Sequence, residues 1–125
     1  MQYKEFINAV GRRAGLPRDE AEALTHATLR VLAERISGGE AEDLKAQMPK
    51  ELQPDLIPPQ EEAQRFGADD FARRVARWTG ISEADAGAGV TAVLATIRDA
   101  VDPGEFDDVL AQLGREFAEL VDAAT

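Results

Sequence analysis

Few residues of this chain have the types needed for nucleophilic or metal chemistry. There is no cysteine, and the two serines are Ser37 and Ser82. Each serine precedes an acidic residue by three positions, Glu40 or Asp85, which is the spacing of a helix N-cap rather than of a nucleophile beside its base. The absence of cysteine excludes disulfides and sulfur-ligated metals. We therefore predict a protein that is not an enzyme, with no catalytic residues and no cofactor.

The single histidine is the other candidate for chemistry. His26 follows Glu22 by four residues, so on a helix the two side chains share one face and could bind a metal ion together. Two ligands do not complete a metal site. We interpret His26 as a surface histidine and predict no metal-binding residues.

Pairs of adjacent carboxylates are common in the chain. They include Glu42-Asp43, Glu61-Glu62, Asp69-Asp70 and Asp107-Asp108. None has the loop spacing of a calcium site or the Glu-x-x-His spacing of a di-iron bundle. We interpret them as solvated helix faces.

The chain contains an internal repeat. Residues 3–56 align with residues 68–121 at an offset of 65 without a gap, and 14 of the 54 columns are identical, where chance would give about four. Residues 57–67 join the repeats, and Pro58 and Pro59 oppose helix formation there. We predict one domain, residues 1–125, with a repeat at 3–56, a linker at 57–67 and a second repeat at 68–121.

Several pairs of polar residues recur at equivalent positions of the two repeats, and four of these pairs lie outside the capping boxes described below. They are Arg12 and Arg77, Asp43 and Asp108, Gln47 and Gln112, and Glu51 and Glu116. We interpret these positions as structural: the arginine pairs with an acid of the third or fourth helix, and the glutamine satisfies a backbone group at a helix junction. The alternative is two equivalent polar recognition sites.

Apolar residues recur at helical spacing throughout both repeats. The first helix places Phe6 and Val10, or Phe71, Val75 and Trp78, on one face and ends at Gly15 or Gly80. The second helix covers roughly 18–35 or 83–100. Capping boxes at 37–40 and 102–105 start the third helix, and a short fourth helix carries Leu52 and Leu56, or Phe117, Leu120 and Val121. The predicted fold class is all-α, with two copies of a three-to-four-helix unit related by a pseudo-twofold axis.

Small residues are concentrated near the start of the second repeat's long helix. Gly87 and Gly89 alternate with Ala86 and Ala88, although glycine costs about 1 kcal/mol relative to alanine inside a helix. We expect this face to approach the other repeat or a second subunit closely.

The charge balance limits the partners. With 24 acidic and 14 basic residues the net charge is −10, which argues against binding to nucleic acid or anionic membranes. The one basic patch with an aromatic residue contains Arg73, Arg74, Arg77 and Trp78, and Asp69 and Asp70 precede it at ion-pairing distance along a helix. No apolar run is long enough to span a bilayer. The missing cysteines and the absence of a signal peptide at the start favour the cytoplasm.

Two segments of the first repeat, KEFINAVGRRAGL and ISGGEAEDLKAQMPKEL, resemble those of a prokaryotic family of small cytoplasmic proteins known as domain of unknown function 2267. The resemblance extends to VDPGEFDDVLAQLGREF in the second repeat and covers nearly the whole chain. It implies a duplicated helical protein. It implies no activity and no catalytic residues.

Three hypotheses of function follow. The first is a non-enzymatic protein-interaction or regulatory module that binds an unknown protein partner or a second copy of itself as a homodimer. The second is binding of a small ligand in a cleft between the repeats. The third is DNA binding by a helix-turn-helix, since a short turn joins the second and third helices; the acidic starts of GGEAEDLKAQ and PGEFDDVLAQ argue against it.

Overall fold

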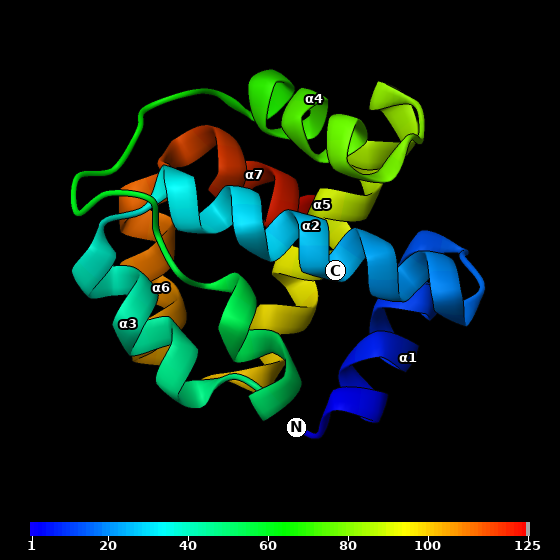
Figure 1. Ribbon diagram of the computed structural model, residues 1–125, viewed down its shortest axis with the longest axis horizontal. Coiled ribbons are helices and arrows are strands. Elements are labelled where there is room, and N and C mark those ends of the chain that lie inside the picture. Colours follow the sequence, from blue (N-terminus) through cyan, green and yellow to red (C-terminus); the bar gives the residue numbers. More distant parts are fainter. Residues whose placement is uncertain (125) are drawn as a thin grey trace.

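The computed structural model describes residues 1–124, which form helices and connecting turns without a β-strand. The predicted all-α class is confirmed. In chain order the elements are α1 (Tyr3–Ala14), α2 (Arg18–Arg35), α3 (Gly38–Gln47), the 3₁₀ helix η1 (Lys50–Asp55), α4 (Ala68–Thr79), α5 (Glu83–Ala100), α6 (Pro103–Leu113) and α7 (Arg115–Ala123) (Figure 1). No helix within residues 1–124 is both long and apolar enough to cross a membrane.

The second set of elements repeats the starting points of the first. Helices α4, α5, α6 and α7 begin 65 residues after α1, α2, α3 and η1. The contacts are also reciprocal: α1 packs against α2 and α5, while α4 packs against α5 and α2. Helices α2 and α5 therefore lie at the centre, where they are covered on several sides and bury residues around most of their circumference.

Helices α1 and α4 cover this centre with one apolar face each. Phe6 and Val10 of α1, and Phe71 and Val75 of α4, are fully buried. Each helix ends at a glycine in the left-handed conformation: α1 at Gly15, with φ 69°, and α4 at Gly80, with φ 78°. The predicted helix ends are confirmed, because glycine adopts this conformation without steric cost.

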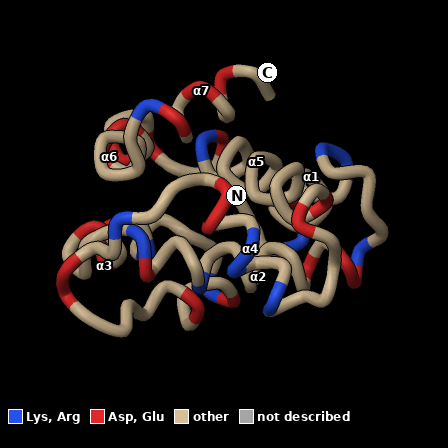
Figure 2. Tube along the Cα trace, turned by 90° about the horizontal axis from the view of Figure 1, so that it is seen from above, with Lys and Arg blue, Asp and Glu red and all other residues tan. Residues whose placement is uncertain are grey.

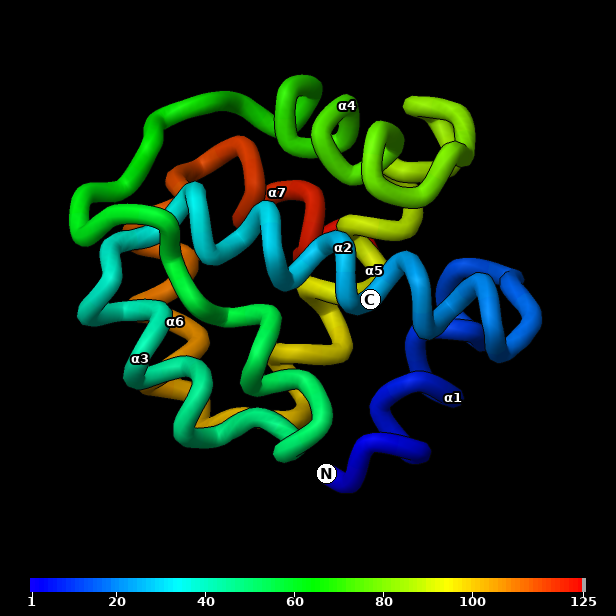
Figure 3. Tube along the Cα trace, viewed as in Figure 1, coloured from blue at the N-terminus to red at the C-terminus, as the bar shows by residue number. Residues whose placement is uncertain are grey.

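Helices α3 and α6 pack against each other at the end of the molecule away from α1 (Figures 1 and 3). Their apolar faces include Ala41, Leu44, Phe106 and Val109, all of which are buried. The two helices enter from α2 and α5 through turns of only two residues, 36–37 and 101–102. These short turns fix where the N-termini of α3 and α6 lie.

Residues 57–67 are attached to α2 and α3 by hydrogen bonds. Gly38 N–H donates to the backbone oxygen of Glu61 at 2.8 Å, and Gln64 N–H donates to the backbone oxygen of Glu34 at 3.0 Å. Phe66 then packs edge-on against Phe71, with 6.0 Å between the ring centroids. The proline-containing segment thus passes the C-terminal end of α2 before it reaches α4 (Figure 3).

Two predicted core residues lie at the surface. Trp78, near the end of α4, is 59% exposed; the Arg30 guanidinium of α2 lies 4.9 Å from its ring centroid. Leu120 is 38% exposed, whereas Phe117 and Val121 of the same helix are buried. The predictions for Trp78 and Leu120 are wrong, since each side chain lies just outside the face that its helix buries.

Candidate functional site

The repeated glutamines join α3 to α6. Ser37 N–H donates to Oε1 of Gln112, and Asp102 N–H donates to Oε1 of Gln47, each at 2.7 Å. Gln112 Nε2 also donates to Oγ of Ser37 at 3.1 Å. Each glutamine therefore satisfies a backbone N–H at the start of a helix in the other half of the chain.

These bonds change the predicted capping boxes. Oγ of Ser37 accepts a hydrogen bond from Glu40 N–H at 3.2 Å, but the side chain of Asp102 makes no capping bond. In a capping box the glutamate at the third position would accept the N-cap N–H. Here the glutamines accept it, so the capping-box predictions are wrong for Glu40 and Glu105, whose carboxylates instead lie together between α3 and α6.

The repeated aspartates border the same pair of glutamates. Burial first, and then the hydrogen bond with Glu40 and the charges of Glu40, Asp43 and Asp108, together raise the pKa of Glu105 to about 8. Asp43 and Asp108 are themselves exposed. The α3–α6 contact therefore gathers four acids, Glu40, Asp43, Glu105 and Asp108, which form two identical pairs at the offset of 65.

The predicted pairing of Arg12 and Arg77 with acids of the third or fourth helix is wrong. Both arginines are exposed, and neither forms an ion pair with any residue of 1–124. The neighbouring Arg13 connects the two halves instead: its guanidinium donates to Thr96 Oγ1 at 2.8 Å and to Asp99 Oδ2 at 2.5 Å. Arg13 points toward α5 because it lies one position further around α1.

The repeated glutamates differ in their contacts. Oε1 of Glu116 accepts a hydrogen bond from Ala68 N–H at 2.8 Å and so caps the start of α4. Glu51 is exposed. The start of α1 is capped by its own residues, Gln2 and Glu5, through a capping box.

A buried arginine holds the linker against the end of α6. Arg35 is 7% exposed and donates to the backbone oxygens of Phe66 at 2.8 Å, Gln112 at 3.0 Å and Leu113 at 2.9 Å. Burial lowers the pKa of Arg35, and the charge of Arg65 lowers it further. Sequence reasoning missed this residue because its partners are backbone atoms distant in sequence and the equivalent position is Ala100.

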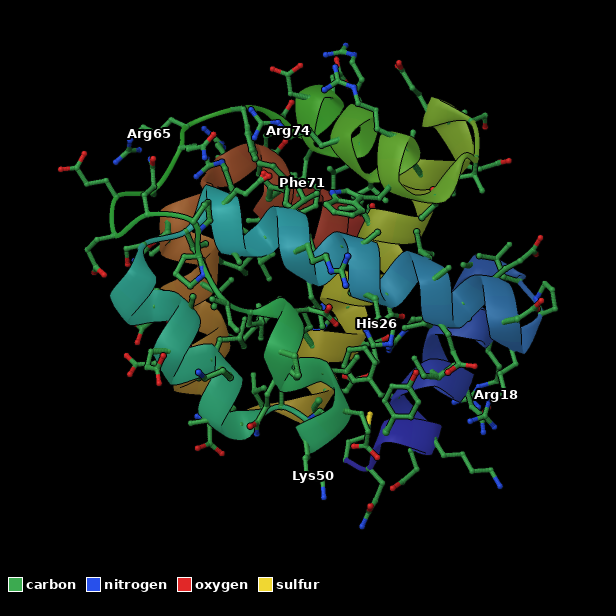
Figure 4. The ribbon with its side chains drawn as sticks, in the orientation of Figure 1. Arg18, His26, Lys50, Arg65, Phe71 and Arg74 are labelled. Atoms are coloured by element: carbon green, nitrogen blue, oxygen red, sulfur yellow. The ribbon has the colours of Figure 1, made fainter. Side chains whose placement is uncertain are left out.

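His26 belongs to a polar network in the first half, so its interpretation as a surface histidine is wrong. Its Nδ1 forms a very short contact with Asp55 Oδ2, and its Nε2 lies 3.2 Å from the Tyr3 hydroxyl, which donates to Glu22 at 2.6 Å. Burial and then the hydrogen bond to Glu22 raise the pKa of Tyr3 to about 12. Figure 4 shows His26 pointing from α2 toward α1. The network ties α1, α2 and η1 together.

The basic patch of α4 is compensated by acids from several elements. Arg73 pairs with Asp70 and with Glu83, and Arg74 lies 3.4 Å from Glu34 of α2. The ring of Phe66 lies 3.7 Å from the Arg74 guanidinium. Figure 4 shows Arg74 above α2, beside the linker. One ion pair within the helix is thus present, between Asp70 and Arg73, and the other pairs of this patch reach residues of α5 and α2.

A shallow cleft separates α2 from the end of α4. It has a volume of about 470 Å³ and is lined by Glu34, Arg74, Arg77 and Trp78. This cleft lies between the two halves, where a small-ligand site is expected.

A larger groove lies entirely in the second half, among α4, α5 and α7. It encloses about 750 Å³. Its apolar surface comes from Ala72, Ala84, Gly87, Ala88, Val90 and Leu120. Gly87 contributes open space, because a Cβ atom there would meet only the Cβ of Ala72, at 3.9 Å. We call this feature the α5 groove.

Apolar residues of the α5 groove stand where the first half has polar side chains that hydrogen-bond to one another. Ala68, Gly87 and Leu120 follow Tyr3, Glu22 and Asp55 by 65 residues. In the first half these three side chains and His26 form the hydrogen-bonded network between α1, α2 and η1. The second half lacks that network and has a groove in its place.

The polar border of the α5 groove is mostly acidic. Four carboxylates line it, from Asp69, Glu83, Glu116 and Glu119, against a single basic residue, Arg73. Arg73 is itself paired with Glu83. Figure 2 shows acidic positions along α7, which forms one side of the groove.

The small residues of α5 serve two surfaces. Gly89 faces α2, where an added Cβ atom would lie 2.5 Å from a methyl carbon of Leu24. The expected close approach to the other half is therefore present at Gly89. Gly87 and Ala88 instead line the α5 groove.

The features above define a small, acidic, all-helical protein with a groove on one half and a carboxylate cluster between α3 and α6. The family described as "Uncharacterized conserved protein (DUF2267)" matches residues 3–120. The chain belongs to this family, as the resemblance of its sequence motifs implies. No curated protein matches the sequence.

Proposed function

We propose that the protein is a non-enzymatic interaction module whose α5 groove binds a basic amphipathic helix of a partner protein. One observation carries this proposal: an acid-bordered apolar groove occupies the positions that Tyr3, Glu22 and Asp55 fill in the first half. A helix-in-groove complex places apolar side chains at i, i+3, i+4 and i+7 into such a surface. The exposed Leu120 offers an apolar contact at its edge.

Charge selects the occupant. A helix with Lys or Arg beside its apolar face would meet Asp69, Glu83, Glu116 and Glu119, and opposite charges across an interface accelerate association and discriminate between partners. A second copy of this chain, with a net charge of −10, would bring another acidic surface to the groove. Charge therefore favours a basic partner over a homodimer, and disfavours nucleic acid.

The absence of an enzymatic activity is part of the proposal. The Asp55–His26–Tyr3 network resembles a proton relay in its order, but the Tyr3 hydroxyl already donates to Glu22 and its pKa of about 12 keeps it protonated. None of these residues lines the α5 groove or the α2–α4 cleft. The network therefore supports a structural role.

We also propose an origin by duplication, with pseudo-twofold symmetry between the two halves. Matching helix starts at an offset of 65 and the reciprocal packing of α1 on α5 and α4 on α2 favour this origin. In that account both halves began alike and later diverged at the positions of the α5 groove.

Binding to a designed helix tests the proposal. The probe is a fluorescent peptide of about 18 residues, roughly 27 Å of helix, with leucine on one face and lysine on the other. We expect it to bind the full chain and a leucine/glutamate peptide of the same pattern not to bind. Binding of both peptides alike, or of neither, would refute the charge argument.

A blocked groove provides the specific control. Gly87→Leu fills the groove, since the new side chain extends into open space, and should weaken binding by at least roughly tenfold, about 1.4 kcal/mol. Ala23→Leu makes a similar change at an exposed position of α2 and should bind like the unmodified chain. Equal affinities of the two variants would place the peptide elsewhere.

A small apolar ligand is the second candidate occupant. The volume of about 750 Å³ lies within the range of roughly 300–1,000 Å³ that is typical of ligand pockets. Native mass spectrometry of the purified chain distinguishes the two: a bound small molecule that is lost in Gly87→Leu favours the ligand. An unliganded mass favours the helix.

A further inference from the structure

Three carboxylates from two helices converge where α3 packs against α6, away from the α5 groove. One oxygen each from Glu40, Asp43 and Glu105 lies within 4.8 Å of the other two. Oxygens on opposite sides of a calcium ion are about 4.6–5.2 Å apart, because each Ca–O bond is about 2.3–2.6 Å. The three oxygens are therefore close enough to share one cation.

No backbone N–H, hydroxyl or basic group of residues 1–124 donates to the carboxyl groups of Glu40 and Glu105, which hydrogen-bond only to each other. The side chain of Glu40 belongs to a residue only 9% exposed, and its Oε2 atom is buried without a hydrogen-bond partner among residues 1–124. Oε2 of Glu105 is also buried without a hydrogen-bond partner among these residues. A buried carboxylate oxygen without a donor is unfavourable. A cation between the helices would supply the missing contact.

No basic side chain of the described residues compensates the cluster. None of the ion pairs within residues 1–124 includes Glu40, Asp43 or Glu105. Asp108 adds a fourth negative charge close enough to raise the pKa of Glu105. Acidic groups collected without Lys or Arg provide only oxygen ligands and negative charge, which suit hard cations.

The helix starts hold the carboxylates in place. Gln112 and Gln47 accept the N-cap N–H groups of α3 and α6, which leaves Glu40 and Glu105 free to face each other. Both halves contain Glu, Asp and Gln at the same spacing, with Asp three residues and Gln seven residues after Glu. The two halves therefore deliver their carboxylates to one point of the α3–α6 contact in a fixed geometry.

We propose that Glu40, Asp43 and Glu105 bind one hard divalent cation, with Ca²⁺ preferred over Mg²⁺. Calcium accepts six to eight oxygen ligands, including carboxylates that bind through both oxygens, whereas Mg²⁺ usually takes one or two carboxylates and keeps several waters. Zinc is disfavoured because the cluster offers neither histidine nor cysteine. Glu40 and Asp43 lie on α3 and Glu105 lies on α6. An ion bound to all three would therefore strengthen the contact between these two helices.

Titration with CaCl₂, MgCl₂ and MnCl₂ tests the proposal on the full chain after treatment with a chelator and its removal. Calorimetry at constant ionic strength should give one Ca²⁺ site, and the Tm should rise with Ca²⁺ more than with Mg²⁺. Glu105→Gln and Glu40→Gln should each weaken Ca²⁺ binding by at least roughly tenfold. Glu42→Gln and Asp107→Asn, exposed acids of the same helices, should leave it unchanged.

Two readouts separate a lost site from a lost fold. Glu105→Gln keeps the shape of the neutral side chain, so the Tm without cation should equal or exceed that of the unmodified chain while the Ca²⁺-induced increase disappears. An equal Ca²⁺ response in Glu105→Gln, or no Ca²⁺ response in the unmodified chain, would overturn the proposal. Neither result bears on the α5 groove, whose peptide assay contains no divalent cation.

Discussion

Replacing either glycine of α5 with alanine tests how the two halves meet. The two positions lie two residues apart in one helix but face different surroundings. A Cβ atom at Gly89 would lie 2.5 Å, 2.6 Å and 3.0 Å from side-chain carbons of Leu24, whereas one at Gly87 would meet only the Cβ of Ala72, at 3.9 Å. Leu24 is 1% exposed, so it has little room to move away.

The magnitude follows from comparing the two variants. In both, alanine gains about 1 kcal/mol of helix propensity over glycine, and this gain cancels in the difference. The steric cost remains at Gly89, where overpacking of a dense core costs about 1–3 kcal/mol. We therefore expect Gly87→Ala to be more stable than the unmodified chain, and Gly89→Ala to be less stable than Gly87→Ala by about 1–3 kcal/mol.

Urea unfolding monitored by circular dichroism measures these differences, and a double-mutant cycle identifies their source. Leu24→Ala creates the space that alanine at position 89 needs, so it should cost less in the Gly89→Ala background than alone, with a coupling of at least about 1 kcal/mol. Equal stability of the two glycine variants, or no coupling to Leu24, would refute the described packing of α2 on α5.

Three further predictions concern polar groups. Arg35→Met should lower the free energy of unfolding by about 2–4 kcal/mol, because three buried carbonyls lose a charged donor, and Arg35→Lys should restore it only partly; urea unfolding measures both. The pKa of Glu105 is near 4.5 in the unfolded chain and about 8 in the folded chain without a cation. The contribution of Glu105 to stability is therefore complete below pH 4.5 and is lost as the pH rises to 8. Between pH 5 and pH 8, the Tm of Glu105→Gln should rise relative to that of the unmodified chain. Gln112→Ala should cost about 1 kcal/mol through the uncapped N–H of Ser37, and a thermal shift equal to that of Lys4→Ala, at an exposed position of α1, would contradict it.

The sequence predicts the helices because their signals are local. Gly15 and Gly80 end their helices through a conformation that glycine favours, and Ser37 and Ser82 cap theirs through the neighbouring backbone. These interactions involve residues within one turn. Spacing along the chain therefore suffices to find them.

The sites depend on contacts between distant segments, which spacing does not reveal. In the sequence, Glu40 has the spacing of a capping box and should accept the backbone N–H of Ser37. In the structure Gln112, 72 positions later, accepts that N–H instead. His26 and Asp55 meet because η1 folds back on α2. The α5 groove results from small residues whose counterparts are large. The repeat contained that information, as a substitution pattern between Tyr3 and Ala68 and between Glu22 and Gly87.

Mapping of peptide contacts by nuclear magnetic resonance tests the central claim most directly. The ¹⁵N-labelled chain is titrated with the leucine/lysine peptide, and the amide shifts are followed residue by residue. The account predicts shifts concentrated at the α5 groove, at Gly87, Ala88 and Leu120, and their loss in Gly87→Leu. Shifts spread evenly over the acidic surface, or centred on the first half at Tyr3 and Glu22, would contradict it.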